Sequence, residues 1–216
     1  ISAYSNKDDS YLVERFINPD KYKEYTLEEY VMGKAKGFES KQWLLIAAGQ
    51  AGKTYEARKL YSLLKENESN VFPLFYEAKM FNHNQELSIP HFWQSNHIVY
   101  IIDGYDEISS EERREKFLIE ITTLQRKYPE LRIVITCRRN FIANDKVLTD
   151  FQRLYLEDLC FDDVKSIIKQ SGIDHQEDFL RQIEENNLYS LVYVPFYLNG
   201  LLDCYRKHTK IPNDRL

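Results

Sequence analysis

Hydrophobic and polar positions follow two different patterns along the chain, and the change of pattern divides it. Up to about residue 156, short continuous apolar runs are separated by stretches with helical spacing of apolar residues. Continuous apolar runs are typical of parallel strands covered on both faces, so this part of the chain predicts an α/β arrangement. The predicted strands are the run that begins at Leu44 and residues 71–76, 98–102, 131–136 and 151–156, with Pro73 indicating an edge strand.

Helical spacing predicts two helices between these strands and only helices after them. The first two cover residues 54–66 and 110–128. Beyond residue 159, Gly172 is expected to end one helix and Pro195 to lie in the first turn of the last. The apolar residues that define these later helices are Val164, Ile167 and Ile168, then Phe179, Leu180 and Ile183, then Val194, Leu198, Leu201 and Tyr205.

The first forty residues are polar and rich in tyrosine, and Thr26 and Glu29 predict a short capped helix there. We expect a lead-in segment over residues 1–40, an α/β core over 41–158 and a small helical domain over 159–216. The predicted fold is a mostly parallel five-stranded sheet with helices on both faces, followed by the helical domain. Since the chain starts at Ile1, we expect it to be a segment of a longer protein. We also expect the helical domain to be truncated at its C-terminal end.

Composition narrows the classes of function. The 216 residues are 43% hydrophobic and 29% charged, which is ordinary for a globular protein, and no apolar run approaches the length of a transmembrane helix. The net charge of −5 argues against broad electrostatic binding of nucleic acid. The three cysteines and five histidines lack metal-ligand spacing, so we expect no zinc site. The cysteines are expected to be buried thiols of a cytoplasmic protein.

A phosphate-binding loop is predicted where the first apolar run ends. Residues Leu44–Thr54 read LLIAAGQAGKT, an apolar run, a small turn with glycine and a Lys-Thr pair at the start of an amphipathic helix. In such loops, backbone N–H groups and the positive end of the helix face the phosphates, Lys53 reaches the terminal phosphates and the Thr54 hydroxyl holds magnesium. The expected nucleotide contacts are Ala48, Gly49, Gln50, Ala51, Gly52, Lys53, Thr54 and Tyr55.

This motif departs from the usual pattern at one position, because Ala47 stands where the first glycine of G-x-x-x-x-G-K-[ST] is expected. Alanine costs little there if the position needs no positive φ, and Gly49 could supply the flexibility instead. The alternative interpretation of the stretch is an ordinary strand-to-helix turn.

An acidic stretch follows the strand at 98–102, reading Asp103-Gly104-Tyr105-Asp106-Glu107. At the carboxyl end of a parallel strand, Asp103 is placed to hold the magnesium shell, usually through water. Asp106 and Glu107 are candidate catalytic residues, since either carboxylate could polarise a water for attack on the γ-phosphate. The alternative is that these acids are only turn residues.

Arg138 follows the strand at 131–136 and is a candidate sensor of the γ-phosphate. Its alternative role is a surface ion pair.

Together these residues resemble the NACHT branch of the STAND P-loop NTPases. The resemblance rests on the phosphate loop, the D-G-x-D-E string, and Thr136-Cys137-Arg138-Arg139, which matches the family's T-[ST]-R-P only at Thr and Arg. Tyr193–Leu198 resembles the family element whose proline, here Pro195, packs near adenine.

The resemblance implies that the Arg138 strand lies between the loop strand and the Asp103 strand. It also implies ATP or ADP with Mg2+, low ATPase turnover, and a switch that oligomerises with ATP, as in bacterial antiviral defence. Effector and sensor domains are then expected elsewhere in a full-length chain. The alternatives are a non-hydrolysing nucleotide-bound scaffold, a AAA-type motor ATPase that needs an arginine finger from a neighbour, and, less favoured, a P-loop kinase.

Overall fold

The computed structural model describes residues 17–18, 25–37, 39–66, 71–83, 86–90, 97–142 and 148–212. It divides the chain into two compact units, one within Phe16–Glu157 and one that includes Asp158–Leu216. Each unit has a hydrophobic core of its own. Of the predicted lead-in, residues 1–16, 19–24 and 38 lie outside the described residues.

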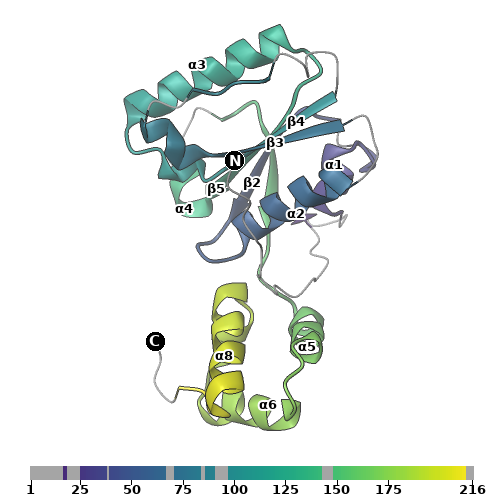
Figure 1. The fold of residues 1–216 in the computed structure, drawn as a ribbon, viewed down its shortest axis with the longest axis vertical. Coiled ribbons are helices and arrows are strands. Elements are labelled where there is room, and N and C mark those ends of the chain that lie inside the picture. Colours follow the sequence, from purple (N-terminus) through teal and green to yellow (C-terminus); the bar gives the residue numbers. More distant parts are fainter. Residues whose placement is uncertain are drawn as a thin grey trace. The chain divides into compact units, whose positions relative to one another are not determined.

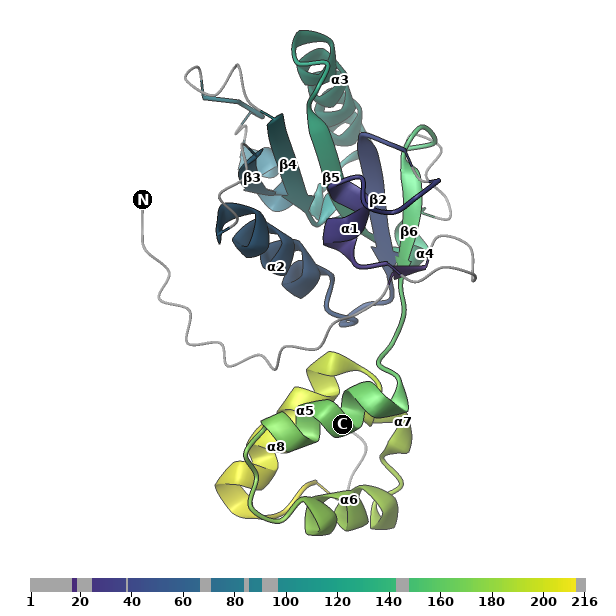
Figure 2. The ribbon, with the colours of Figure 1, turned by 90° about the vertical axis from the view of Figure 1, so that its right-hand side faces the viewer.

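The first unit, whose sheet is seen in Figure 1, has a 6-stranded sheet in the order β1-β6-β2-β5-β4-β3. Figure 2 labels the strands from β6 to β3 in this order. The five strands from β2 to β6 pair in parallel, which confirms the predicted sheet, and β5 lies between β2 and β4. Sequence analysis missed β1, a two-residue strand that pairs antiparallel with β6. The strands are β1 (Ile17–Asn18), β2 (Gln42–Ala47), β3 (Val71–Glu77), β4 (His97–Asp103), β5 (Arg132–Arg138) and β6 (Gln152–Leu156).

Helices cover both faces of this sheet (Figures 1 and 2). Side chains of a strand alternate between the two faces, so Leu44 and Ile46 join the core under α3 (Glu111–Lys127) and α4 (Arg139–Ile142). Their neighbours Trp43, Leu45 and Ala47 join the core under α1 (Leu27–Val31) and α2 (Lys53–Glu66). The alternation decides which residues at the strand ends face α2.

Pro73 lies in β3, which is an edge strand of the sheet, as predicted. A proline fits there because an edge strand leaves one row of N–H groups unpaired. The short helix η1 (Ala78–His83) follows β3 directly and brings Asn82 toward the end of β4.

The predicted capping box of α1 is present. The Thr26 hydroxyl accepts a hydrogen bond from the Glu29 backbone N–H, and the Glu29 carboxylate accepts one from the Thr26 N–H. Tyr30 and Val31 of this helix are fully buried in the core on the α2 face. The described part of α1 therefore packs against the sheet.

The second unit is helical. Phe179 and Ile183 lie in its core, and Leu180, which helical spacing groups with them, is 44% exposed. Leu180 follows Phe179 by one residue, about 100° round the helix, and so falls beside the apolar face. Pro195 occupies the first turn of the last helix, as predicted. The helices are α5 (Phe161–Gln170), α6 (Gln176–Glu185), α7 (Tyr189–Val192) and α8 (Pro195–His208).

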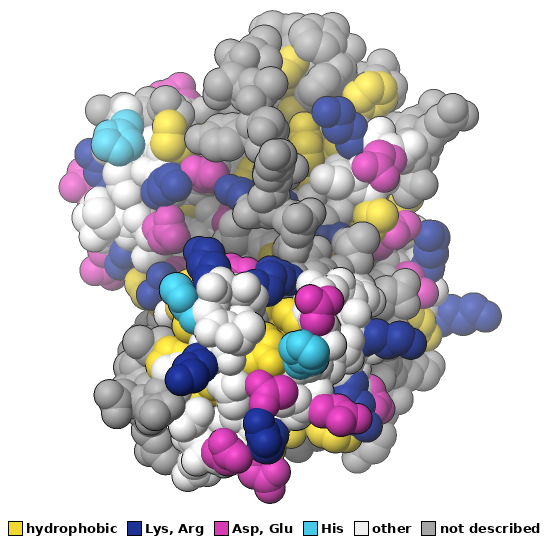
Figure 3. Space-filling model, turned by 60° about the horizontal axis from the view of Figure 1, so that its bottom comes forward, with side chains coloured by type: hydrophobic (Ala, Val, Ile, Leu, Met, Phe, Trp, Pro, Cys, Tyr) yellow, Lys and Arg dark blue, Asp and Glu magenta, His cyan; other side chains and the backbone are white. Residues whose placement is uncertain are grey.

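The expectation that the cysteines are buried is wrong for Cys160. Cys137 is buried, but Cys160 is exposed, because it is the residue that precedes α5. On the face shown in Figure 3, basic and acidic side chains are interspersed over the helical unit. Among the described residues, no helix is long and apolar enough to cross a membrane.

Candidate nucleotide-binding site

The predicted phosphate loop joins the end of β2 to the start of α2. Residues 48–50 are exposed, Ala51 is buried, and Lys53 is the first residue of α2. Positive φ angles occur at Gln50 (65°) and Gly52 (91°). Gly49, the residue expected to give the loop its flexibility, has no positive φ. The left-handed conformation occurs instead at the next residue, Gln50.

Ala47 fits the first glycine position of the motif without strain. It is the last residue of β2, is fully buried, pairs with Arg138 in the sheet register and has no positive φ. A residue without a positive φ can carry a Cβ without backbone strain. The departure from the usual motif therefore leaves the loop's entry intact.

Lys53 turns back over the loop. Its Nζ donates a hydrogen bond to the Ala48 carbonyl oxygen at 2.9 Å. Partial burial lowers the pKa of Lys53 below its usual 10.5, opposed by the negative charges of Asp106 and Asp103 and aided by Arg138. These charges reach Lys53 because all four groups gather at the carboxyl ends of β2, β4 and β5. The lysine is thus close to the predicted acids and sensor arginine.

The first two residues of α2 after the lysine differ in exposure. Thr54 is exposed in the first turn of the helix, and Tyr55 is half-buried. The Thr54 hydroxyl can therefore be reached from outside the protein at the positive end of α2. The metal role of Thr54 stays a prediction.

Asp103 ends β4 and is held by a residue that the sequence analysis did not single out for a role. The Thr136 hydroxyl of β5 donates a hydrogen bond to Asp103 Oδ1 at 2.6 Å and accepts one from the Gly104 N–H at 2.9 Å. Gly104 has a left-handed φ of 81°, which turns the chain sharply into the short helix η3 (Tyr105–Glu107). Glycine suits this position because other residues adopt such a φ with strain.

Asp106 and Arg138 form a close ion pair. Asp106 Oδ1 accepts a hydrogen bond from the Arg138 backbone N–H at 3.0 Å, and Asp106 Oδ2 lies 2.9 Å from Arg138 Nε. The Asp106 side chain is only 7% exposed, while that of Arg138 is 55% exposed. The carboxylate is therefore engaged by the arginine, and most of the arginine still reaches the surface.

Glu107 differs from Asp106, because its side chain is exposed and folds back over Gly104. Asn82 of η1 donates to the Glu107 carbonyl oxygen at 2.9 Å and accepts from the Ser109 N–H and hydroxyl, each at 2.9 Å. These hydrogen bonds of Asn82 therefore hold the backbone from Glu107 to Ser109 in place. No motif in the sequence marked Asn82, because its partners lie more than twenty residues away.

Glu77 is a further acid at this edge of the sheet that sequence analysis missed. It lies opposite Asp103 in the register of β3 and β4. Hydrogen bonding to Lys79 at 2.8 Å lowers the pKa of Glu77, and Arg58 of α2 lies 3.5 Å away. The acid is thus neutralised by two cations beside the site.

Oxygen atoms are the donors that this site can offer to a metal. The Thr54 hydroxyl and the Asp103 carboxylate are hard ligands of the kind Mg2+ prefers, and Mg2+ usually keeps several waters. Among the described residues, no cluster of three or more His, Cys, Asp or Glu side chains is arranged to hold a metal. The donor set therefore fits magnesium shared with phosphate oxygens rather than a metal held by the protein alone.

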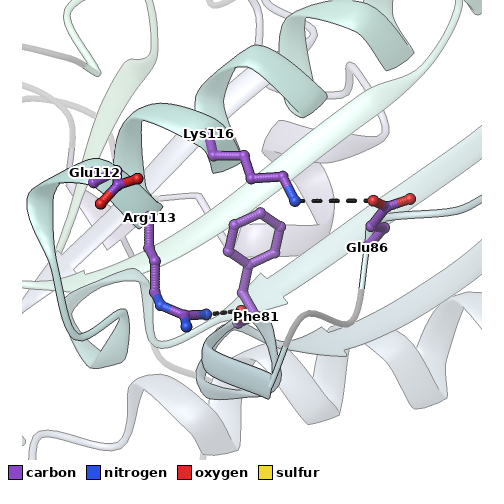
Figure 4. Close-up of a pocket in the computed structure, with 5 residues that line it drawn as sticks. All are labelled: Phe81, Glu86, Glu112, Arg113 and Lys116. Carbon is purple, nitrogen blue, oxygen red and sulfur yellow. Dashed lines mark hydrogen bonds and ion pairs between the residues drawn. The ribbon is translucent and has the colours of Figure 1, made fainter.

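Two cavities of the sheet unit lie away from these residues. One, of about 200 Å³, is lined by Phe81 of η1, Glu86, and Glu112, Arg113 and Lys116 of α3 (Figure 4). Its Arg113 donates a hydrogen bond to the Phe81 carbonyl oxygen at 3.0 Å. The other cavity lies at the amino ends of β2 and β5. Neither contains a predicted site residue.

Pro195 belongs to the helical unit, at the start of α8. Its predicted contact with adenine stays a prediction.

Comparison with known proteins bears on the fold. No family model matches the sequence, and no curated protein matches it significantly. The structure is similar to the Orc1 protein of Aeropyrum pernix, solved in complex with DNA, with a TM-score of 0.53 and 12% identity over 86% of this chain and 60% of that one. It is also similar to the RuvB Holliday junction branch migration motor of Thermotoga maritima, at 14% identity over 80% of this chain and 58% of that one. The TM-score of that second match, 0.48, is too low to carry an argument.

The chain has a P-loop NTPase fold, supported by the Orc1 similarity and by the parallel sheet that carries the loop at the end of β2. It spans 60% and 58% of the lengths of the two proteins it resembles.

Proposed function

We propose that this chain is a nucleotide-binding module that takes ATP or ADP together with Mg2+. One observation carries the proposal: Ala47, where the loop that leads to Lys53 leaves β2, pairs with Arg138 of β5 in the sheet. Arg138 in turn lies 2.9 Å from Asp106, so the loop and the acids meet at one edge of the sheet. A cation, a helix N-terminus and a metal-binding acid at one sheet edge are the groups that polyphosphate binding needs. The loop of residues 48–52, which is exposed at 48–50, would supply the backbone N–H groups.

Each side chain then has a distinct task. Lys53 would exchange its hydrogen bond to Ala48 for one to the terminal phosphates. The Thr54 hydroxyl would hold magnesium directly, and Asp103 would hold it through water. Magnesium, when bound, neutralises charge on the phosphate oxygens. The phosphate contacts of the loop are the backbone groups of residues 48–52.

In hydrolysis at this site, Asp106 and Glu107 would have different roles. Glu107 is exposed and so can polarise a water for attack on the γ-phosphate, as a general base does. Asp106 is engaged by Arg138, and its role is to orient the guanidinium toward the γ-phosphate. We expect low turnover, because a neighbouring subunit often completes such sites.

The module acts as a switch of the NACHT and STAND type. This part of the proposal is supported by the D-G-x-D-E string and the Thr136-Cys137-Arg138-Arg139 stretch. ADP would hold the protein closed, and ATP would permit oligomerisation in cytoplasmic antiviral signalling. Residues 41–158 would form the nucleotide core and 159–216 the lid, with Pro195 beside adenine.

The first test is nucleotide binding by Lys53→Ala. We expect the affinity for ATP to fall by about tenfold or more, because hydrogen bonds to charged groups contribute about 1.5–3 kcal/mol. Lys65→Ala is the matched control: it removes the same charge from an exposed position at the far end of α2. If Lys53→Ala binds ATP and ADP as tightly as the parent, the loop assignment is wrong.

A AAA-type ATPase is the second candidate, favoured by the fold shared with Orc1. Such an enzyme needs an arginine from a neighbouring subunit, so its turnover per subunit should rise with protein concentration. A self-contained switch module should show a constant turnover per subunit across the same range.

A further inference from the structure

Thr136 is one of few buried polar residues in the described part of the chain. Its side chain is fully buried in β5, where transfer of an unpaired hydroxyl from water would be unfavourable. The hydroxyl acts both as a donor and as an acceptor. It donates a hydrogen bond to Asp103 Oδ1, with 2.6 Å between the two oxygens, and it accepts one from the Gly104 N–H, with 2.9 Å between nitrogen and oxygen. A hydroxyl has only one proton, so these two bonds fix its direction.

The sheet brings this hydroxyl to the end of β4. Thr136 pairs with Leu45 of β2, and the preceding residue Ile135 pairs with Ile102 of β4. Thr136 lies two residues beyond Val134, which packs on the α2 face, so alternation puts Thr136 on that face too. The hydroxyl therefore meets Asp103 on the side of the sheet where α2 and its phosphate loop lie.

The bond to Asp103 is of the strong kind. Hydrogen bonds from a hydroxyl to a carboxylate are about 2.5–2.7 Å long and roughly twice as strong as neutral ones. This bond selects one orientation of the Asp103 carboxylate and occupies Oδ1, which leaves Oδ2 for the water shell of a metal. Magnesium demands near-ideal octahedral geometry, so the orientation of each oxygen ligand matters.

We propose that Thr136 is a positioning residue for magnesium, which acts by orienting the Asp103 carboxylate through its hydroxyl. The inference rests on the proposed nucleotide function, whose metal ligand it orients. The competing explanation is structural: the hydroxyl would serve only to satisfy the Gly104 N–H at the turn. The two explanations differ in whether removal of the hydroxyl changes the magnesium requirement or the stability alone.

The test is a titration with MgCl2 of the Thr136→Val variant, which keeps the shape of the side chain and removes the hydroxyl. We expect the Mg2+ concentration for half-maximal tightening of ATP binding to rise by about tenfold or more, since partners that orient metal ligands contribute roughly 10–100-fold to metal affinity. ATP affinity measured in EDTA should stay at the parent value. Thr136→Ser, which retains the hydroxyl, should restore the parent requirement.

Thr122→Val is the matched control, because the Thr122 hydroxyl on α3 bonds only to the exposed turn before it, at the Leu118 carbonyl. It should leave the MgCl2 titration unchanged. If Thr136→Val does not give a cooperative thermal transition, Thr136→Ala replaces it, with the same expected rise. A parent-like Mg2+ requirement in a folded variant overturns the inference, as does an equal loss of ATP affinity in EDTA.

The outcome also separates this inference from the proposed function. If the parent binds ATP in a Mg2+-dependent way and Lys53→Ala does not, a parent-like titration of Thr136→Val refutes the inference alone. If the parent itself binds no nucleotide, the proposed function fails and the role of Thr136 fails with it.

Discussion

At the scale of single residues, the ion pair between Asp106 and Arg138 gives two neighbouring acids different environments. Asp106 is 7% exposed and contacts Arg138 through both oxygens, while Glu107 is exposed. The sequence presents them as an equivalent acidic pair. Their difference arises from the way η3 turns after Gly104.

We expect Arg138→Ala to weaken ATP binding by about tenfold or more and to leave ADP binding unchanged, because only ATP carries the γ-phosphate. Asp106→Ala should weaken ATP binding in the same direction but less, since the guanidinium loses its orientation and keeps its charge. The double variant should be no worse than Arg138→Ala. Isothermal titration with both nucleotides provides the measurement.

The control for these variants is Asp203→Ala, which removes an exposed ion pair with Arg206 on α8. It should not change the ratio of ATP to ADP affinity. A gain of ATP affinity in Asp106→Ala would mean that Asp106 competes with phosphate for the arginine, and its orienting role would be wrong.

Residue identity alone indicated most of the candidate site. Lys53, Thr54, Asp103 and Arg138 could be chosen from motifs because their chemistry and spacing are local in the chain. Thr136 and Asn82 could not be assigned a task, because their partners Asp103 and Glu107 lie far away in sequence. A hydroxyl or amide has no preferred role until the fold provides a partner.

At the scale of elements, the turn between β4 and η3 depends on Gly104. Its φ is 81°, and a Cβ at this position would lie 3.1 Å from the Glu107 Cδ. We expect Gly104→Ala to reduce the free energy of unfolding by about 1–2 kcal/mol through left-handed strain. It should also reduce turnover, because Glu107 must move aside. Chemical denaturation and ATPase assays check the two effects.

Gly49→Ala is the control for stability within the same unit, since Gly49 has no positive φ and a Cβ there would meet no atom within 4 Å. Its free energy of unfolding should match or slightly exceed that of the parent. Equal stability of Gly104→Ala and Gly49→Ala would show that the turn tolerates a side chain.

Long elements with a continuous or regular apolar pattern were predicted well. The five parallel strands, α2, α3 and α8 follow from runs and spacing that burial requires. The two-residue strand β1 and the short helices η1 and α7 escaped prediction, because so few residues show no period. Their formation depends on neighbours such as β6, which pairs with β1.

At the scale of the whole molecule, turnover and assembly distinguish a switch from a scaffold. We expect Glu107→Gln to reduce ATP turnover by about 100-fold or more, since a general base contributes roughly 10²–10⁴-fold. ATP binding should persist, because the exchange removes only a charge. Light scattering should show assembly of this variant with ATP and none with ADP.

Glu111→Gln serves as the control, since it neutralises an exposed acid at the start of α3, and it should turn over ATP at the parent rate. A rate in the parent that does not depend on Glu107 would support a scaffold in which the nucleotide is structural.

The sequence by itself determined the kinds of element and their order along the chain, because apolar periodicity and the phosphate-loop motif are local properties. The order of strands in the sheet came only from the family resemblance, and the structure confirmed that β5 lies between β2 and β4. Only the tertiary structure decided that Thr136 holds Asp103 and that Arg138 engages Asp106. These contacts join residues more than thirty positions apart, and they exist because parallel strands bring their carboxyl ends to one edge of the sheet.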